Sequence, residues 1–131
     1  MEDCIFCKIV DGKIPSVKIW EDDRHVAILD INPSTEGATL VLTKKHFDSY
    51  AFEMPEQDYS ALMLAAKKVA KLLDKGLNVK RTVMVMEGFD VNHAHIKLYP
   101  ARPGYSLTKL GSPKSSEELK KVAEKITRNN K

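Results

Sequence analysis

The sequence predicts an α+β domain, with an antiparallel sheet of about five strands, one long inserted helix and a second helix at the end. Short stretches with strand character are separated by turn residues, and two longer stretches carry apolar residues at helical spacing. A chain of 131 residues is long enough for one domain with a real core. We therefore expect a single domain, with its core at about residues 4–100 and a helical C-terminal extension at 101–131.

The first third of the chain predicts three strands after a short N-terminal arm. Residues 4–16 are short and turn-like, with Asp11-Gly12 as a break. Residues 17–20 and 25–29 predict a hairpin joined through a polar connection. Residues 39–43 predict the third strand. The histidine at position 25 is expected to be exposed to solvent.

The clearest helix is predicted at residues 55–73. Pro55 suits the first helical position, and Glu56 and Asp58 place acids in the first turn. Gly76 is positioned to cap the C-terminal end. The apolar stripe, which we interpret as ordinary core packing, consists of Tyr59, Leu62, Ala66, Val69 and Leu73.

Two more strands and a last helix complete the prediction. Residues 81–86 and 92–100 have strand character, and Pro100 ends the second of them. Ser115 and Glu118 have the spacing of a capping box. The helix that follows is amphipathic, with Leu119, Val122, Ala123 and Ile126 on its apolar face.

The strand at 92–100 carries the most informative pattern, because side chains alternate between the two faces of a strand. Ala94, Ile96 and Leu98 form one face, which we expect in the core. The other face aligns His93, His95 and Lys97. Imidazoles held in such a row suit nucleophilic attack, proton transfer or metal ligation. The alternative is that they are surface histidines on a solvated sheet face.

The composition excludes several classes of protein. The sequence is 43% hydrophobic and 30% charged, as in soluble globular proteins, and it contains no apolar run long enough to span a membrane. With no recognisable signal peptide, we expect a cytoplasmic protein. The net charge is only +3, and aromatic residues make up 7% of the chain, so no dedicated nucleic-acid surface is predicted.

Cys4 and Cys7 have the C-x-x-C spacing that can grip one zinc ion with two thiolates. Two further ligands would be needed. The alternatives are two reduced, buried thiols or a redox couple, and the missing preceding strand disfavours the redox couple.

Several segments, taken in order, resemble the histidine triad (HIT) superfamily of nucleotide hydrolases and transferases. They are the CIFCKI opening with Ile14-Pro15, then LDINP, LTKKH and HAHIK, and they extend from about Cys4 to Tyr99. The resemblance implies a twisted antiparallel sheet and a homodimer whose sheets join. It is greatest to the small nucleotide-binding branch, which acts on nucleoside phosphoramidates and adenylates. A dinucleoside polyphosphate hydrolase is the second possibility.

The resemblance also implies roles for the row of basic residues. His93 matches the first triad histidine, His95 matches the nucleophile, and His46 matches a histidine that approaches from a neighbouring strand end. Lys97 replaces the third histidine. The implied reaction cleaves a purine nucleotide at its α-phosphate through a covalent nucleotidyl-histidine. The alternative is a nucleotide-binding regulatory module with little turnover, because lysine is a poor proton shuttle at its ordinary pKa.

The same resemblance implies binding residues. In the family, the acid matching Asp30 takes the ribose hydroxyls; a turn-forming role for Asp30 before Asn32 is equally open. Asn92 could offer its amide to a phosphate. His46 and His93 would complete a structural zinc site with Cys4 and Cys7. The expected base-binding residues are Ile5, Phe6, Ile9, Ile14 and Ile28.

Overall fold

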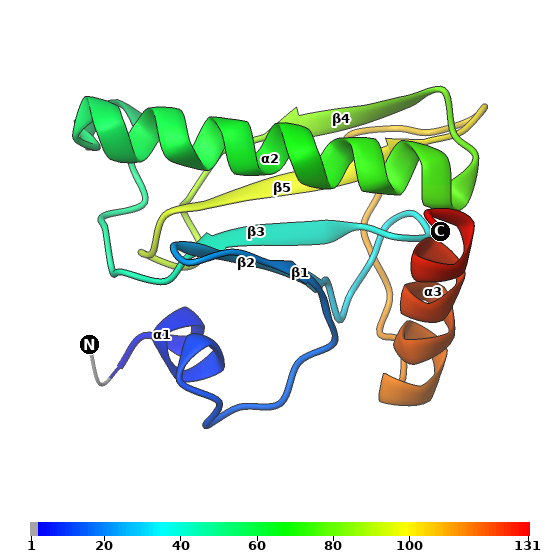
Figure 1. Ribbon diagram of the computed structural model, residues 1–131, viewed down its shortest axis with the longest axis horizontal. Coiled ribbons are helices and arrows are strands. Elements are labelled where there is room, and N and C mark those ends of the chain that lie inside the picture. The colour runs from blue at the N-terminus through cyan, green and yellow to red at the C-terminus, as the bar shows by residue number, and fades with distance from the viewer. Residues whose placement is uncertain (1–2) are drawn as a thin grey trace.

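The computed structural model describes residues 3–131 and shows a mixed α+β fold (Figure 1). Its five strands form one antiparallel sheet in the order β1-β2-β3-β5-β4. The predicted fold class is therefore confirmed. The elements are α1 (Ile5–Val10), β1 (Lys18–Glu21), β2 (His25–Leu29), β3 (Thr39–Thr43), the 3-10 helix η1 (Ala51–Glu53), α2 (Glu56–Leu77), β4 (Arg81–Val85), β5 (His95–Ala101) and α3 (Ser116–Asn129).

The long helix α2 lies along one face of the sheet, while α1 lies on the other side and α3 packs near the end of α2 (Figure 1). Strand alternation explains the main core. Ala94, Ile96 and Leu98 are almost completely buried on the α2 side, as predicted. Leu119 and Ile126 of α3 belong to the same apolar cluster, so the C-terminal extension contributes to the main core.

The opposite face of the sheet is apolar as well, but only a short segment covers it. Val26, Ile28 and Leu42 point to this side and pack with Phe6 and the cysteines around α1. His95 shares this face, since it pairs with Leu42 in the register of β3 and β5. The row of basic residues therefore begins beneath α1. His93 and His95 are buried, so the alternative of surface histidines on a solvated sheet face is wrong for these two residues.

The N-terminal arm differs from the prediction, because part of the turn-like segment is helical. Cys4 caps α1 by accepting a hydrogen bond at its sulfur from the Cys7 N–H, at 3.4 Å. The six-residue helix is too short to show a repeating apolar stripe in the sequence. Its inner side buries Phe6 and Cys7 against the sheet.

The predicted end of the long helix is also wrong. α2 continues to Leu77, and Asn78 takes the left-handed capping position with φ of 52°. Gly76 lies inside the helix instead of capping it. A Cβ atom at Gly76 would stand 2.7 Å from the Cα of Ile126, so glycine allows α3 to pack closely against α2.

The prediction that His25 is exposed is wrong too, because only 3% of its surface is accessible. Its Nδ1 lies 3.0 Å from the Asp22 carboxylate. Partial burial alone would raise the pKa of Asp22, but hydrogen bonds from the backbone of Arg24 and His25 outweigh that effect and lower it. The pair thus closes the β1–β2 hairpin.

Within residues 3–131, none of the helices combines the length and apolar character that crossing a bilayer requires.

Candidate metal centre and active site

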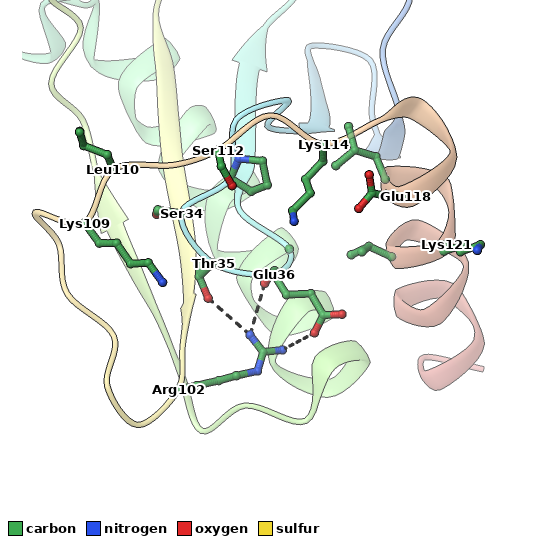
Figure 2. Close-up of a pocket in the computed structure, with 14 residues that line it drawn as sticks. Ser34, Thr35, Glu36, Arg102, Lys109, Leu110, Ser112, Lys114, Glu118 and Lys121 are labelled. Atoms are coloured by element: carbon green, nitrogen blue, oxygen red, sulfur yellow. Dashed lines mark hydrogen bonds and ion pairs between the residues drawn. The ribbon is translucent and has the colours of Figure 1, made fainter.

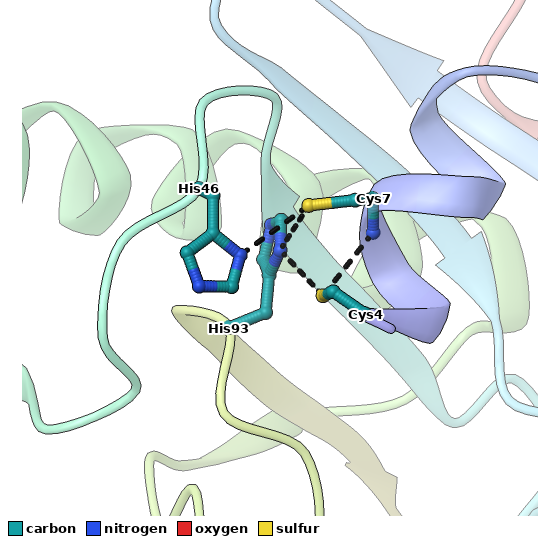
Figure 3. A group of neighbouring side chains, drawn as sticks. All are labelled: Cys4, Cys7, His46 and His93. Carbon is teal, nitrogen blue, oxygen red and sulfur yellow. Dashed lines mark hydrogen bonds between the residues drawn. The ribbon is translucent and has the colours of Figure 1, made fainter. Parts of the chain in front are cut away.

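Residues from three separate segments meet at the start of β5. Cys4 and Cys7 lie one turn apart on α1, His46 follows β3, and His93 precedes β5. Because β3 and β5 are antiparallel neighbours, the end of one lies beside the start of the other. α1 then brings its two sulfur atoms over this point (Figure 3).

The four side chains are spaced as metal ligands. The Cys4 sulfur and His93 Nδ1 are 3.2 Å apart, and the Cys7 sulfur is 3.3 Å from His46 Nδ1 and 3.4 Å from His93 Nδ1. All four ligand atoms lie within 4.8 Å of one another. Tetrahedral zinc with ordinary bond lengths would separate sulfur and nitrogen ligands by about 3.6 Å. The group can therefore hold a metal ion.

A hydrogen bond behind the group orients His93 for this role. The His93 Nε2–H donates to the carbonyl oxygen of Thr43 at 2.7 Å. This bond fixes the proton on Nε2 and leaves the lone pair of Nδ1 facing the sulfurs. Metal-ligating histidines commonly have such a partner. Burial lowers the pKa of His93, which favours the neutral form that a metal requires.

His95 lies beside this group and is held in a defined tautomer. Its Nδ1–H donates to the backbone carbonyl of His93 at 2.7 Å, so Nε2 carries the free lone pair. The edge of Phe6 packs on the imidazole, with ring centroids 4.9 Å apart. Burial lowers the pKa of His95, and the charge of Lys97 lowers it further. The imidazole is therefore neutral at pH 7.

Lys97 follows His95 on the same face of β5. It is half-buried and stands between Leu40 and Val85 in the register of the sheet. No hydrogen bond or ion pair within residues 3–131 engages its amino group. The arrangement thus presents a neutral imidazole and a free cation, two residues apart, on one rigid strand.

The predicted base-binding residues are only partly brought together. Phe6, Ile9 and Ile28 belong to the apolar cluster on the face that bears His95. Ile5 projects from α1 and remains 46% exposed. Ile14 is partly buried in the loop after α1 and lies outside that cluster.

The predicted polar binding residues take part in local structure. Asp30 accepts the backbone N–H of Asn32 at 2.9 Å, so the turn-forming interaction is present. Only one carboxylate oxygen is used in that bond. Asn92 accepts the N–H of Ser49 at 2.9 Å through its amide oxygen, which ties the loop before β5 to the loop after β3.

Two residues that support the site, Thr43 and Ser49, were not among the predicted ones. Thr43 contributes its backbone carbonyl to His93, and such a contact depends on strand register instead of residue type. Ser49 is buried, and its hydroxyl donates to the Gly88 carbonyl at 2.7 Å. A Cβ at Gly88, where φ is 78°, would stand 2.7 Å from Ser49. The glycine between two strands was a visible signal of this close approach.

Comparison with known proteins identifies the family. A family model of the HIT domain matches residues 11–104. The chain belongs to the HIT superfamily. A HIT-like protein of Methanocaldococcus jannaschii is 36% identical over 91% of this chain and 98% of its own length. The adenosine 5′-monophosphoramidase of Schizosaccharomyces pombe is 33% identical over 95% of this chain and 96% of its own.

The solved structures of HIT proteins agree with the fold, and one of them contains zinc. A zinc-bound histidine triad protein from Mycobacterium smegmatis superposes with a TM-score of 0.78 and 27% identity, over 98% of this chain and 96% of that one. The Cys₂His₂ group found here is thus able to hold a metal in a family with a zinc-bound relative. The prediction that these four residues can hold a metal ion is therefore confirmed, and the Mycobacterium smegmatis relative contains zinc.

Proposed function

We propose that this HIT protein hydrolyses nucleoside phosphoramidates at the α-phosphate, with His95 as the nucleophile. One observation carries the proposal. The Nδ1–H of His95 donates a hydrogen bond to the His93 carbonyl. Nε2 is therefore the unprotonated nitrogen of a buried, neutral ring. The free ammonium of Lys97 stands on the same strand face. Relatives named as adenosine 5′-monophosphoramidases support the choice of substrate class.

The reaction takes place in two displacements. The Nε2 lone pair of His95 attacks phosphorus, the bond from phosphorus to the leaving nitrogen breaks, and the departing amine takes a proton from solvent. Water then attacks the phosphorus of the nucleotidyl-histidine, the bond from phosphorus to Nε2 breaks, and a water proton is lost to solvent, which releases the nucleoside monophosphate and restores the neutral imidazole. Covalent catalysis divides one difficult displacement into two easier steps. Lys97 stabilises the phosphate oxygens as negative charge builds on them.

The metal centre would prepare the nucleophile without contacting the substrate. Cys4, Cys7, His46 and His93 would hold zinc, and the bound ion supplies a structural cross-link between α1 and the start of β5. The backbone carbonyl of the ligand His93 is the group that orients His95. Both cysteines are free and buried, and thiol ligands of this kind suit the reducing cytoplasm, where we place the protein.

The nucleoside would lie on the sheet face beside α1. Ile9 is partly exposed at the edge of the apolar cluster and could contact a purine base, and the buried side chains of Phe6 and Ile28 lie beside it in the same cluster. The carboxylate of Asp30 has an oxygen left over from its turn, and it can accept a ribose hydroxyl. Asn32 lies in the same turn, and Asn92 would present its amide N–H groups to a phosphate oxygen.

We also propose a homodimer that forms through β4. The two edge strands of the sheet differ. β1 carries the ion pairs of Glu21 with Lys18 and Lys44, which discourage strand pairing. β4 exposes 47% of Met84, and a cavity beside it is lined by aromatic side chains. Replacing Met84 by lysine is expected to convert a dimer to a monomer in light scattering.

A second candidate function is a nucleotide-binding regulatory module with little turnover. The third triad position favours it, because Lys97 cannot readily move protons to a leaving group.

Dinucleoside polyphosphates are the alternative substrate, since their leaving group is a phosphate that needs less protonation.

The decisive experiment offers the metal-loaded protein adenosine 5′-monophosphoramidate and diadenosine polyphosphates and measures AMP release. We expect release from the phosphoramidate, and its loss in His95→Ala, while AMP binding survives. A protein that binds AMP tightly but releases none from any of these substrates would be the regulatory module. Near wild-type turnover in His95→Ala would rule out the proposed mechanism.

A further inference from the structure

A cavity of about 650 Å³ lies at the end of the sheet opposite the metal centre. Its walls are the loop between β2 and β3, the segment that follows β5, and the first turns of α3 (Figure 2). Backbone hydrogen bonds hold these walls together, because the N–H of Lys114 donates to the carbonyl of Ile31 at 2.9 Å. The volume is typical of sites that bind small molecules.

The acidic side chains of the cavity are already engaged. Glu36 accepts from Arg102 at 2.9 Å and from Lys125 at 3.4 Å, so one carboxylate is shared by two cations. Glu118 accepts the backbone N–H of Ser115 at 3.2 Å as part of the capping box of α3. Glu118 stays ionised, because its hydrogen bonds and the nearby charges of Lys114 and Lys121 lower its pKa. The walls still carry more cations than carboxylates, since Glu36 and Glu118 are outnumbered by Arg102, Lys109, Lys114 and Lys121.

Two lysines of the cavity have no such partner. Lys109 and Lys114 direct their amino groups into the space between the walls, whereas Lys121 points away from it (Figure 2). Within residues 3–131, no hydrogen bond or ion pair engages the amino group of Lys109 or Lys114. Together with the guanidinium of Arg102, they form a cluster of positive charge around a hollow. Such clusters recognise phosphate groups.

A smaller cavity of about 130 Å³ continues from this one, and the two share Ser34, Thr35, Arg102 and Lys109. Tyr105 lines the smaller cavity, and its hydroxyl is buried without a hydrogen-bond partner in the described part of the chain. Buried polar groups are rarely left unpaired. The apolar wall of the larger cavity includes Leu119 and Val122, which can contact carbon atoms of a ligand.

We propose that this cavity is a second binding site, specific for a small anion that carries two or more phosphate groups. Lys109 and Lys114 would contact the phosphates. Arg102, which is paired with Glu36, would add positive charge to the cavity wall. The site is separate from His95, since the cavity lies past the far end of β5 from the metal centre. The proposal therefore does not depend on the hydrolase activity.

The test measures binding of inorganic tripolyphosphate to the metal-loaded protein by titration calorimetry. The double variant Lys109→Gln with Lys114→Gln removes the two free cations. The matched control is Lys67→Gln with Lys71→Gln, which removes the same charge from exposed positions on α2. We expect the first pair to weaken binding about tenfold or more, and the control pair less than about threefold. Equal losses, or no saturable binding to the wild type, would overturn the proposal.

Amide chemical shifts distinguish this site from the active site. We expect tripolyphosphate to shift residues 34–37 and 109–114, and we expect those shifts to persist in Lys97→Gln. Shifts confined to residues 93–97, or their loss in Lys97→Gln, would show that the anion binds beside His95 and would overturn the proposal.

Discussion

The two ends of the sheet are held together by different kinds of interaction. At the start of β5, four polar ligands and two carbonyl hydrogen bonds fix the positions of a few side chains. At the opposite end, α3 buries apolar side chains in the main core, and Asn129 and Asn130 also donate hydrogen bonds to backbone carbonyls of α2. The first arrangement determines orientation, and the second contributes stability. The difference shows that the orientation of the His95 imidazole depends on a few polar contacts at one end of the sheet.

The helices at the two ends illustrate the contrast. α1 has six residues, and a helix of that length is not stable by itself in water. α3 has fourteen residues, a complete capping box, and Leu119 and Ile126 buried against the core. We therefore expect α1 to depend on the metal and α3 to be independent of it.

The largest expected effect is at the metal end. The double variant Cys4→Ser with Cys7→Ser removes two thiolate ligands, and binding of a structural zinc is worth on the order of 10 kcal/mol. We expect the metal to be lost and residues 5–10 to exchange their amide hydrogens as freely as an unfolded peptide. Residues 116–129 are expected to stay protected. Equal loss of protection in both helices would contradict the separation.

The second variant is Ile126→Ala, which truncates a side chain of α3 that is buried in the main core. Ile126 is 2% exposed, and truncating such a side chain costs about 2–5 kcal/mol of unfolding free energy. We expect denaturant unfolding to show this loss while zinc content stays at about one per chain. Lys120→Ala, at an exposed position on the same helix, is the control. Loss of zinc in Ile126→Ala would show that the two ends are coupled.

Lys97 lies between the two ends and is expected to affect catalysis but not stability. If it holds the α-phosphate, Lys97→Ala lowers kcat/KM about tenfold or more, because a charge-assisted contact is worth about 1.5–3 kcal/mol. We also expect Lys97→His to lower turnover, since the rest of the strand is well packed around a lysine. Unchanged kinetics in Lys97→Ala would mean that the lysine only fills space.

The smallest effect concerns the cap of α3. Ser115→Ala is expected to cost about 1 kcal/mol of unfolding free energy. Hydrogen bonds from Ser115 lower the pKa of Glu118, so the contribution of this carboxylate is present above its ordinary value of 4.5 and is lost as the pH falls below it. The difference in unfolding free energy between the wild type and Ser115→Ala is therefore expected to become smaller at acidic pH. A constant difference would contradict this view of the cap.

The sequence predicts the packed parts of the fold better than the polar ones. The alternation of Ala94, Ile96 and Leu98 and the stripe on α2 identified the core, because burial follows periodicity. α1 could not be found in this way, since six residues give no period. The continuation of α2 past Gly76 depends on the close approach of Ile126, which is a tertiary contact.

For the site, the C-x-x-C spacing identified Cys4 and Cys7, and the resemblance to the HIT superfamily added His46, His93 and His95. They could not identify Thr43, because its backbone carbonyl acts through strand register. They also could not show that one carboxylate oxygen of Asp30 accepts the Asn32 N–H, or that the Asn92 side chain accepts the Ser49 N–H. Those outcomes depend on which of several possible hydrogen bonds the folded loops allow.

The most direct test of the central claim is to trap the covalent intermediate. The metal-loaded protein is mixed with adenosine 5′-monophosphoramidate, quenched within milliseconds to seconds, and examined by intact and peptide mass spectrometry. We predict one nucleotidyl group per chain, attached to His95 and absent from His95→Ala, with His25 unmodified as the internal control. Rapid AMP release by the wild type with no adduct at any time point, or an adduct on a residue other than His95, would contradict the account.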